Sequence, residues 1–403
     1  MLKLIDTWDE FQSLRAAWNH LADRQRSPLL RHEFFSAALS ASQAAPAIYV
    51  LVKKGEPAAI APFECVGSRG VSRYRSIGRD LHEPSQLLYS GLAPLEELLA
   101  ELRQIGRPIL LSRVPANGPE TVALRSALGY GDFMHVSDGG TSPAVPLYGG
   151  FEEVLSRISS SRRADIRRKL RLAEKLGPVT MTAIAPEPDQ VDVSLSAFLR
   201  LEASGWKGSC GSAILPNPAR KRFFETYSSA LAEDGRLRLF FLRIGDDTVA
   251  ARLAIVHNDC LWELKIAYDE TFHKVSPGTL LTLETIRYAC DAGLQRLEFL
   301  GRVSDWNKWW GVELQNHSTI RFYPRSLASL ACLAIDGFDV MNSAIRGRPA
   351  HIGLAGAVWP GDPGLLELEP VAAARDQPGL VPRDLLNQFI EEFGPSCAQM
   401  AFV

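Results

Sequence analysis

The sequence predicts a mixed α/β protein made of two related units in tandem, each with a mixed central sheet flanked by helices. Four features recur in the same order in both halves: a Phe-x-x-Leu motif, a tryptophan, a pair of phenylalanines and a turn glycine. The matched positions are Phe11 and Phe198, Trp18 and Trp206, Phe34-Phe35 and Phe223-Phe224, and Gly55 and Gly245. The offset grows slowly along the chain, as single-residue loop insertions would cause, so a tandem duplication is the leading interpretation.

Length and composition agree with this organisation. A chain of 403 residues is too long for one core and suits two domains. Its 46% apolar and 22% charged residues are ordinary for a soluble globular protein. A net charge of −2 gives no overall attraction to DNA or to an anionic membrane. The six cysteines are widely spaced without a C-x-x-C motif, so we expect neither a disulfide framework nor a metal site.

The N-terminal residues argue against a secretory signal. Acids at Asp6, Asp9 and Glu10 occupy the region where a signal peptide needs an apolar run. The longest apolar stretch, 327–335, falls far short of the roughly 20 residues that span a bilayer. We therefore expect a cytoplasmic protein without a transmembrane segment.

The first unit is expected to cover residues 1–149. Apolar spacing predicts helices, and short apolar runs around turn residues predict strands. The helices are expected at 8–24, 94–105 and 119–129, and the strands at 48–52, 57–63 and 108–112. Asp138-Gly-Gly-Thr-Ser-Pro and the Gly149-Gly150 pair have the composition of a linker to the second unit.

A basic helix is expected to open the second unit, over 151–176. Its basic residues are Arg157, Arg162, Arg163, Arg167, Arg168, Lys169, Arg171 and Lys175. Two interpretations are open: a solvated charged face, or an anion-binding surface for a phosphate or an acidic glycan.

The second unit is expected to cover residues 150–345. Helices are predicted around 191–206, 220–232, 277–292 and 325–345, and strands at 236–244, 249–257, 260–269, 296–301 and 318–323. Residues 346–403 are rich in Pro, Gly and Ala with few aromatic residues, and we expect a loosely ordered tail.

The start of the 277–292 helix has the chemistry of an anion site. Ser276 suits the N-cap and Pro277 the first helical position. Gly278 leaves the backbone open to close approach, and the free N–H groups of Gly278, Thr279 and Leu280 are expected to point out of the helix start. Many well-capped helices share these traits, so a purely structural interpretation also stands.

Two carboxylates on and after the 260–269 strand are candidate general bases. Glu263 lies on the opposite face from the apolar side chains of this strand, where burial would raise its pKa. Alternatively, Glu263 and Lys265 pair with cross-strand neighbours. Asp269 ends the strand, where it could accept a proton or cap a loop.

Tryptophans cluster in the segment Asp305-Trp-Asn-Lys-Trp-Trp. Trp306 and Trp309 could line a pocket for an apolar or sugar-like group, with Lys308 as a donor to a developing oxyanion. A small aromatic core is the alternative. Trp206-Lys207-Gly208 allows the same two interpretations.

Together these motifs resemble those of the CelD/BcsL-like branch of the GNAT acyltransferases, linked to the synthesis of cellulose and other exopolysaccharides. The motifs that carry the resemblance are Trp206-Lys207, Gly245 with Ala250-Ala251, Tyr268-Asp269, Ser276-Pro-Gly-Thr-Leu-Leu, Gly293-Leu294 and Lys308. The chain is also similar to the Fem-like aminoacyltransferases, which carry two GNAT-like units in tandem. The resemblance covers residues 150–325 well and the first unit only in outline.

The resemblance implies where a donor would bind. In the GNAT fold, two central parallel strands splay apart and acyl-CoA lies in the gap, its pyrophosphate on the helix start that corresponds to 276–280. Lys274-Val-Ser-Pro-Gly-Thr stands here in place of the usual Arg/Gln-x-x-Gly-x-Gly/Ala signature. Lys274 joins the expected donor-binding residues, and Glu298 occupies the fifth-strand position where the family usually has Asp.

The implied reaction is transfer of an acetyl group from acetyl-CoA to an amine or hydroxyl of a glycan or other sugar-like acceptor, without a metal. The proton would go to Glu263, Asp269 or Glu298, and Lys308 or fourth-strand amides would stabilise the oxyanion. The acceptor groove would lie between the units, the degenerate first unit forming one wall. Its lining residues are expected to be Trp206, Lys207, Tyr268, Trp306 and Trp309.

Two alternatives remain open. A Fem-like enzyme would transfer an amino acid from aminoacyl-tRNA to a peptidoglycan precursor, with the basic helix on the RNA. A non-catalytic scaffold would have two degraded units, although the Pro-Gly helix start, Asp269 and Lys308 persist in one of them. The expected partners are therefore a small-molecule or glycan acceptor and peripheral contact with envelope-synthesis machinery, without DNA, and with RNA only for the Fem-like enzyme.

Overall fold

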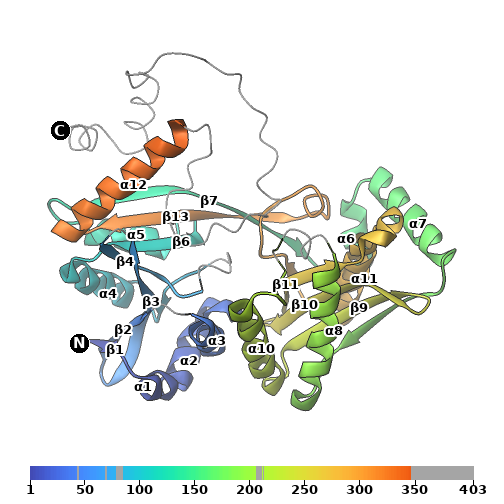
Figure 1. Cartoon of the computed structure of the whole chain (residues 1–403), viewed down its shortest axis with the longest axis horizontal. Helices are drawn as coiled ribbons and strands as arrows, with labels where there is room; N and C mark the ends of the chain where they lie inside the picture. The colour runs from blue at the N-terminus through green and yellow to red at the C-terminus, as the bar shows by residue number, and fades with distance from the viewer. Residues whose placement is uncertain (43–44, 69, 79–84, 206–210, 212, 346–403) are drawn as a thin grey trace.

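The computed structural model describes residues 1–42, 45–68, 70–78, 85–205, 211 and 213–345, which form two lobes joined by a continuous sheet (Figure 1). The expected tail, 346–403, lies outside the described residues. Within these residues the strands form one mixed 13-stranded sheet with helices on its faces, which confirms the predicted fold class. No helix in this part of the chain has the length and apolar content needed to cross a membrane.

The first half of the chain runs from β1 to β7. Its strands are β1 (Leu2–Ile5), β2 (Ala45–Lys53), β3 (Glu56–Ser68), β4 (Val71–Ser76), β5 (Leu88–Tyr89), β6 (Ile109–Pro115) and β7 (Phe133–Pro146). Its helices are α1 (Trp8–Ser13), α2 (Arg15–Gln25), η1 (Pro28–Leu30), α3 (His32–Ala41), α4 (Leu92–Ile105) and α5 (Pro119–Ala127).

The second half repeats this order in outline from β8 onwards, after the helices α6 and α7. Its helices are α6 (Gly150–Arg157), α7 (Ser160–Glu174), η3 (Pro188–Gln190), α8 (Val191–Ser204), α10 (Pro218–Glu233), η4 (Glu270–Val275), α11 (Pro277–Asp291) and α12 (Leu327–Ile345). Its strands are β8 (Val179–Ile184), β9 (Leu237–Ile244), β10 (Asp247–His257), β11 (Cys260–Tyr268), β12 (Arg296–Glu298) and β13 (Glu313–Tyr323).

The order of strands in the sheet reproduces the duplication. From one edge to the other it reads β1-β2-β3-β4-β6-β13-β7-β12-β11-β10-β9-β8, so corresponding strands of the two halves lie at mirrored positions. The hairpin around Gly55 corresponds to the one around Gly245, and both glycines have positive φ. Each half also contains one parallel pair, β4 with β6 and β11 with β12.

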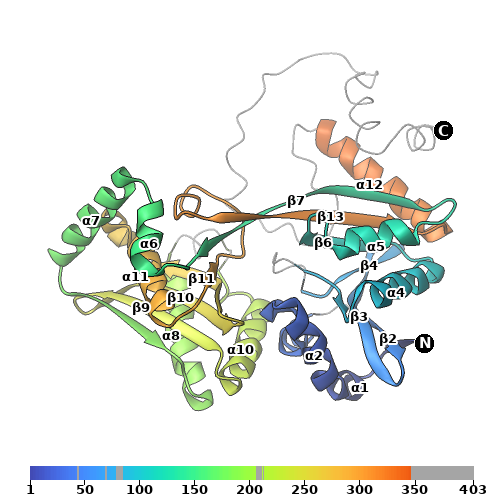
Figure 2. The ribbon, with the colours of Figure 1, turned by 180° about the vertical axis from the view of Figure 1, so that it is seen from behind.

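The last strand of each half lies against the other half. β7 pairs with β12 through Ala144 and Glu298, whereas β13 pairs with β6 through Phe322 and Ile109. β7 and β13 also pair with each other along most of their length, and α12 packs on β4 and β13 (Figure 2). The sequence predicts β13 and α12 in the unit 150–345, whereas β13 pairs with β6 and β7 of the first half and α12 packs on β4 and β13.

Two expectations about the middle of the chain are wrong. The Asp138-Gly-Gly-Thr-Ser-Pro segment, expected as a linker, lies inside β7. Gly139 lies at a register shift of the pairing with β13, opposite His317 and Ser318. A Cβ at Gly139 would lie 2.9 Å from the backbone of Ser318, so glycine here allows close strand approach rather than flexibility. The basic helix expected over 151–176 is two helices, because Ile158 is extended and the Ser159 side chain caps α7.

Within the described ranges, three hydrophobic cores hold the sheet between its helices. One is shared by both halves and joins α1–α3 to α8 and α10 across one face of the sheet. The other two lie on the opposite face, one under α4 and α5 and one under α6, α7 and α11. In the shared core, Phe34 of α3 packs edge-on against Phe223 of α10, with ring centroids 5.5 Å apart.

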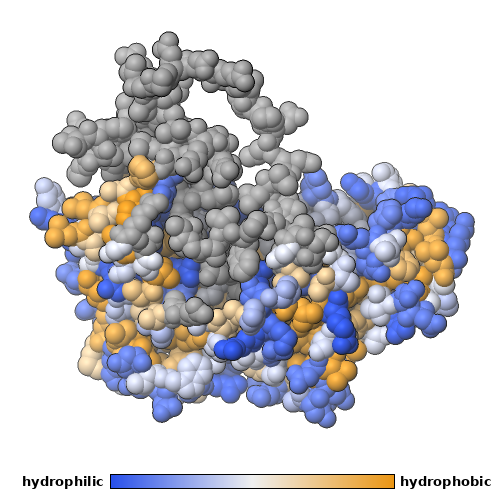
Figure 3. Space-filling view, viewed as in Figure 1, coloured by the Kyte–Doolittle hydropathy of each residue, from blue (hydrophilic) through white to orange (hydrophobic). Residues whose placement is uncertain are grey.

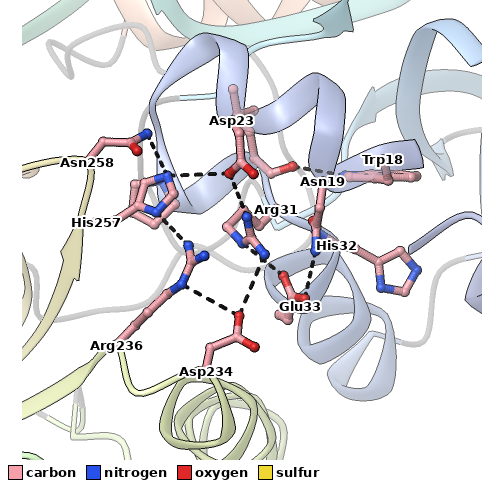
Figure 4. A network of polar contacts seen from close by, with 12 residues as sticks. Trp18, Asn19, Asp23, Arg31, His32, Glu33, Asp234, Arg236, His257 and Asn258 are labelled. Atoms are coloured by element: carbon pink, nitrogen blue, oxygen red, sulfur yellow. Dashed lines mark hydrogen bonds and ion pairs between the residues drawn. The ribbon is translucent and has the colours of Figure 1, made fainter. Parts of the chain in front are cut away.

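A polar network lies beside this core and connects the two halves (Figure 4). Arg31 contacts Asp23 of its own half at 2.5 Å and Asp234 of the second half at 3.6 Å. Arg236 then bonds to Nδ1 of His257 at 2.5 Å. Packing and charge pairing together hold the two halves in a defined relative position. This position matters for the candidate active site, because both halves contribute residues to it.

Candidate active site

The parallel strands β11 and β12 separate after a short pairing. They pair only from Cys260 with Arg296 to Trp262 with Glu298, while β11 continues to Tyr268. After Glu298 the chain turns away from β11, and Leu300 has a positive φ of 57°. The sheet therefore opens between the two strands just beyond Trp262 and Glu298.

β11 has an irregularity at this opening. Leu253 of β10 pairs with Lys265 and its neighbour Ala254 pairs with Glu263, so Leu264 is an extra residue in the ladder. A bulge of this kind re-aims the backbone groups next to it. Leu264 lies two residues beyond Trp262, the last β11 residue that pairs with β12.

Helix α11 begins close to the end of β11, after the 3₁₀ turn η4. Ser276 is its N-cap residue in the left-handed region (φ 51°), but its side chain makes no capping hydrogen bond. The Ser276 carbonyl accepts from the N–H of Thr279 at 2.9 Å and of Leu280 at 3.2 Å. The expectation of three free amides is therefore wrong for Thr279 and Leu280, and Gly278 carries the outward-facing amide at this helix start.

The surroundings of this helix start suit an anion. Ser276, Gly278 and Thr279 are half-buried and Lys274 is exposed, so a ligand can reach the backbone. The ammonium of Lys169, on α7, donates to the carbonyl of Lys274 at 2.9 Å. Exposed arginines follow on α7, whose region is largely hydrophilic in Figure 3. The dipole of α11, the amide of Gly278 and the basic residues of α7 together suit the binding of a polyphosphate group.

Gly278 leaves open space at the helix start without requiring glycine. Its φ is not positive, and a Cβ added there would lie at ordinary contact distance, 3.6 Å from Cδ1 of Tyr268 and 3.9 Å from Cδ1 of Ile266. Tyr268 itself is half-buried beneath the start of α11. An alanine would fit at Gly278, whereas a larger side chain would extend into the space above the helix start.

Glu263 is held in an ion pair beneath α11. Its carboxylate lies 2.8 Å from Nε of Arg252, whose side chain is fully buried. Arg252 also donates to Oγ1 of Thr282 in α11 at 2.8 Å. Burial lowers the pKa of Arg252 and the Glu263 charge opposes that shift. Of the two interpretations of Glu263, pairing with a cross-strand neighbour is confirmed, and that neighbour is Arg252 of β10.

Asp269 adopts the capping geometry left open by the sequence. Its Oδ1 accepts from the backbone N–H of Thr271 at 2.8 Å and from the Thr271 hydroxyl at 2.7 Å. These bonds begin η4, the turn that leads to Ser276. Asp269 thus shapes the approach to the helix start.

Glu298 lies on the opposite face of the sheet from Glu263. Paired residues of neighbouring strands share a face, which places Glu298 with Trp262 and Ala144, and Ser142 two residues further along β7. Its carboxylate bonds to Nε of Arg296 at 2.5 Å. Burial raises the pKa of Glu298 above its usual range, against the lowering effect of Arg296.

A cavity of about 90 Å³ lies on this face, between the two halves. Its walls come from α2 and η1 of the first half, from β11 and β12, and from β7 and β13, the last strand of each half, which pairs with the other half. The lining residues are Gln25, Ser27, Leu29, Leu30, Gln86, Pro115, Ser142, Trp262, Glu298, Leu300, Gln315 and His317. The candidate base Glu298 thus faces a cavity that both halves build.

A buried polar chain supports one wall of the cavity. Oγ of Ser142 is hydrogen-bonded to Nε2 of His317 at 2.9 Å and accepts from the guanidinium of Arg113 at 2.8 Å. The same guanidinium nitrogen of Arg113 reaches the carbonyls of Leu300 and Gly301. Burial, together with the charge of Arg113, lowers the pKa of His317 to about 4, which keeps the ring neutral. The sequence did not identify these residues, because Ser142 falls in the segment interpreted as a linker and Arg113 and His317 lie just outside the predicted strands 108–112 and 318–323.

The tryptophans after β12 lie apart from this cavity. Trp310 is fully buried and stacks on Trp309 in the core under α6, α7 and α11. Trp306 is 43% exposed and packs edge-on against Phe299. Lys308 is exposed and pairs with Asp305 on the surface. For Trp309 and Trp310 the geometry is that of an aromatic core.

Two of the expected acceptor-binding residues, Trp206 and Lys207, lie outside the described residues. In the described part of the chain, no cluster of His, Cys, Asp and Glu side chains has a metal-binding arrangement. The site therefore has two accessible parts, the start of α11 on one face of the opened sheet and the cavity at Glu298 on the other.

Comparisons with known proteins agree with this geometry. Residues 160–308 match the family model described as "Acetyltransferase (GNAT) domain". The crystal structure of FemX is 13% identical over 79% of this chain and 96% of that chain, with a TM-score of 0.54. A conserved protein of unknown function from Bacteroides thetaiotaomicron VPI-5482 is 12% identical over 80% of this chain and 100% of that chain, with a TM-score of 0.51.

No curated protein is significantly similar in sequence. The two solved structures share the fold over most of the chain, including both halves. The splayed strands and open helix start lie inside the segment that the family model matches. The family match over residues 160–308 therefore supports acyltransferase chemistry in this part of the chain.

Proposed function

We propose that this protein transfers an acetyl group from acetyl-CoA to a hydroxyl or amine of a sugar-like acceptor, in exopolysaccharide, cellulose or cell-envelope biosynthesis, as in the CelD/BcsL-like branch. One observation carries the proposal: β11 and β12 separate between an open helix start on one face and a buried carboxylate, Glu298, on the other. A donor and an acceptor can therefore approach the same gap from opposite faces.

The donor is assigned to the start of α11. The pyrophosphate would rest on the amide of Gly278 and the dipole of α11, with Lys274 beside it and Ser276, Pro277, Thr279 and Leu280 shaping the turn. Acetyl-CoA supplies an activated acyl thioester. A carboxylate placed at position 278 would oppose this binding through its charge, whereas an alanine would not.

The general base is assigned to Glu298. An acceptor hydroxyl or amine must lose its proton as it becomes acylated, and a carboxylate with a raised pKa accepts a proton more readily. Glu263 is engaged by Arg252 on the other face, and Asp269 is engaged by Thr271. Glu298 is the candidate of the three that lines a cavity.

Stabilisation of the developing oxyanion is assigned to the β11 backbone at the bulge. Leu264 lies outside the regular ladder with β10 and beyond the last pair with β12, next to the opening. Fixed backbone dipoles aimed at a developing charge are an efficient form of stabilisation. Lys308, exposed and paired with Asp305, is the second candidate for this role.

The Fem-like alternative has one observation in its favour, the exposed basic residues of α7 next to the helix start. In that case the donor would be an aminoacyl-tRNA, whose phosphates α7 would contact. The scaffold alternative predicts no turnover at all. In every case we assign the first unit, 1–149, the role of a wall for the acceptor site.

The test is release of free CoA from acetyl-CoA, measured with a thiol reagent, while candidate acceptors are added one at a time. The panel contains neutral sugars, amino sugars, nucleotide sugars and lipid-linked sugars. We expect acceptor-dependent CoA release with at least one of them. Acyl transfer from aminoacyl-tRNA without any from acetyl-CoA would support the Fem-like alternative instead.

A further inference from the structure

We propose that the outward face of α12, formed by Leu327, Leu330, Ala334 and Phe338, is the docking surface for a later segment of the same chain, residues 383–393. This inference goes beyond the proposed acyl transfer, because it concerns a surface outside the candidate active site and holds for any donor. It follows from the composition of this face, the way α12 is anchored, the sequence of the later segment and the length of chain between the two.

The outward face of α12 is apolar. Leu327 is 87% exposed, Leu330 54% and Phe338 52%, and Ala334 is exposed between them. Residues three, four and seven positions apart lie on one side of a helix, so these four form a stripe about 16 Å long. None of the exposed residues from Leu327 to Phe338 is charged. Where Figure 3 shows α12, the surface is mostly hydrophobic.

The inward face of α12 is anchored by polar contacts. Asp336 is 1% exposed, and its two carboxylate oxygens accept from the guanidinium of Arg73 on β4 at 2.7 and 2.8 Å. The hydroxyl of Tyr323 donates to the same carboxylate at 2.5 Å. At the start of the helix, the hydroxyl of Ser326 donates to the carbonyl of Gly106 at 2.5 Å. These contacts fix the rotation of α12 on the sheet, so the apolar stripe faces outwards.

This arrangement differs from that of an ordinary surface helix, which buries its apolar stripe and exposes its charged side chains. α12 buries the carboxylate of Asp336 and exposes the large apolar side chains of Leu327 and Phe338. A continuous exposed apolar surface of this kind marks an interaction site. We therefore looked for an apolar face of similar length that could cover it.

The chain beyond α12 contains a segment with a matching pattern. Residues 383–393 lie outside the described residues, and their sequence is Arg-Asp-Leu-Leu-Asn-Gln-Phe-Ile-Glu-Glu-Phe. Pro382 precedes the segment and Gly394-Pro395 follows it, which are start and stop signals for a helix. The apolar residues recur at helical spacing, with polar residues between them. The sequence thus predicts one apolar face, made of Leu385, Leu386, Phe389, Ile390 and Phe393.

The chain between the two surfaces is long enough for docking. It consists of 37 residues, 346–382, and an unfolded chain of that length spans roughly 30–36 Å on average. α12 has 19 residues and a length of about 28 Å, so the segment can reach any part of it. A tether of this kind raises the local concentration towards about millimolar. This favours a segment of the same chain over a second copy in dilute solution.

The charges at the ends of the two apolar faces are complementary. Arg325 is exposed immediately before α12, where the helix dipole is also positive. Glu391 and Glu392 lie near the end of the segment. An antiparallel arrangement brings these two carboxylates to Arg325 and the start of α12, so the charges support the same pairing as the apolar faces.

The test is photo-cross-linking in the full chain, without any acyl-CoA. p-Benzoylphenylalanine takes the place of Phe338, and mass spectrometry after digestion identifies the peptide with which it reacts. The matched control position is Trp8 on α1, an aromatic residue that is 51% exposed, against 52% for Phe338. Because no donor or acceptor is present, the result does not depend on the proposed function.

Two double variants separate the faces of the segment, since each adds two acidic residues. Phe389→Asp with Ile390→Asp changes the apolar face, whereas Asn387→Asp with Gln388→Glu changes the polar face. Burying a carboxylate in an apolar contact is costly, so we expect the first variant to lower the cross-link yield by at least about fivefold and the second to retain it. Equal yields in the two variants would overturn the proposal.

Without these substitutions, we expect cross-links within one chain, from position 338 to residues 383–393, and few from position 8. Cross-links spread evenly over 346–403, or equal yields from both positions, would indicate contact through the tether alone and would overturn the docking. Cross-links between chains that increase with protein concentration would assign the surface to a second copy instead. The absence of any cross-link from position 338 would also contradict the proposal.

Discussion

Trp262 of β11 and Glu298 of β12 are the last paired residues of two parallel strands, and both side chains face the cavity between the halves. Beyond this pair the sheet opens. The start of α11 lies on the other face, where Arg252 and Glu263 are buried beneath the helix. The proposed roles of the acidic residues follow from this division, Glu298 in proton transfer and Glu263 in stability.

Glu298→Gln removes the proposed base while preserving the shape of its side chain. We expect the acceptor-dependent kcat to fall by roughly 10²- to 10⁴-fold with the acetyl-CoA Kd unchanged. Wild-type activity should rise with pH through a pKa above the usual glutamate range, and the variant should lose this dependence. The matched control is Glu313→Gln, which removes the other carboxylate bound to Arg296, 2.7 Å away, and should retain activity. Equal losses in both variants would count against the assignment.

Glu263 should matter for stability. Glu263→Gln leaves the buried Arg252 without its counter-charge, and breaking such a pair costs about 3–5 kcal/mol. Urea unfolding measures this loss as a lower midpoint. The double variant Arg252→Met with Glu263→Leu replaces the pair by apolar side chains and should recover most of the stability. A Glu263→Gln protein that unfolds at the wild-type urea concentration would show that the pair does not hold α11 in place.

The two tryptophans Trp306 and Trp310 should respond differently to truncation. Trp310 is 1% exposed and part of the core, so Trp310→Ala should cost about 3–5 kcal/mol of unfolding free energy. Trp306 is 43% exposed, and Trp306→Ala should cost less than about 1 kcal/mol. Chemical denaturation of both variants provides the comparison. If Trp306→Ala instead raised the acceptor KM with stability unchanged, the original pocket interpretation of Trp306 would regain support.

Three histidines with lowered pKa values predict acid sensitivity. Burial lowers the pKa of His135, His257 and His317 to about 4, whereas unfolded histidines titrate near 6.5. The unfolded chain therefore binds more protons between these values, and stability should fall as pH drops through that window. Each histidine contributes a slope of up to about 1.4 kcal/mol per pH unit. His257→Gln should reduce the slope and the exposed His20→Gln should not, as measured by urea unfolding at several pH values.

Much of the fold follows from local pattern. The aromatic helices, the hairpins around Gly55 and Gly245, and helix α11 with its Ser276-Pro277 start all appear where apolar spacing and turn residues predict them. The duplication was visible because aromatic core positions were kept in both copies. These features depend on residues close together in the sequence, and so a single chain is enough to find them.

The features that the sequence did not predict depend on pairing between residues far apart in the chain. Gly139 in β7 has linker composition, but its real role is to let β13 approach, which only the pairing with Ser318 explains. The pairing of β7 with β12 and of β13 with β6 also joins residues that are far apart in the sequence. The partner of Glu263 was hidden for a related reason, because Arg252 sits in an apolar run and charge alone does not tell which way it points. One clue was available: an arginine inside a buried strand needs a counter-charge.

The most direct test of the central claim is the affinity of acetyl-CoA, measured by calorimetry, for wild type, Gly278→Ala and Gly278→Glu. The alanine fits beside Tyr268 at 3.6 Å and should leave the Kd within a few-fold of wild type, whereas the glutamate brings a like charge to the phosphates and should weaken binding by at least tenfold. Binding of acetyl-CoA that is equally tight in all three proteins, or absent from the wild type, would contradict a donor site at the start of α11.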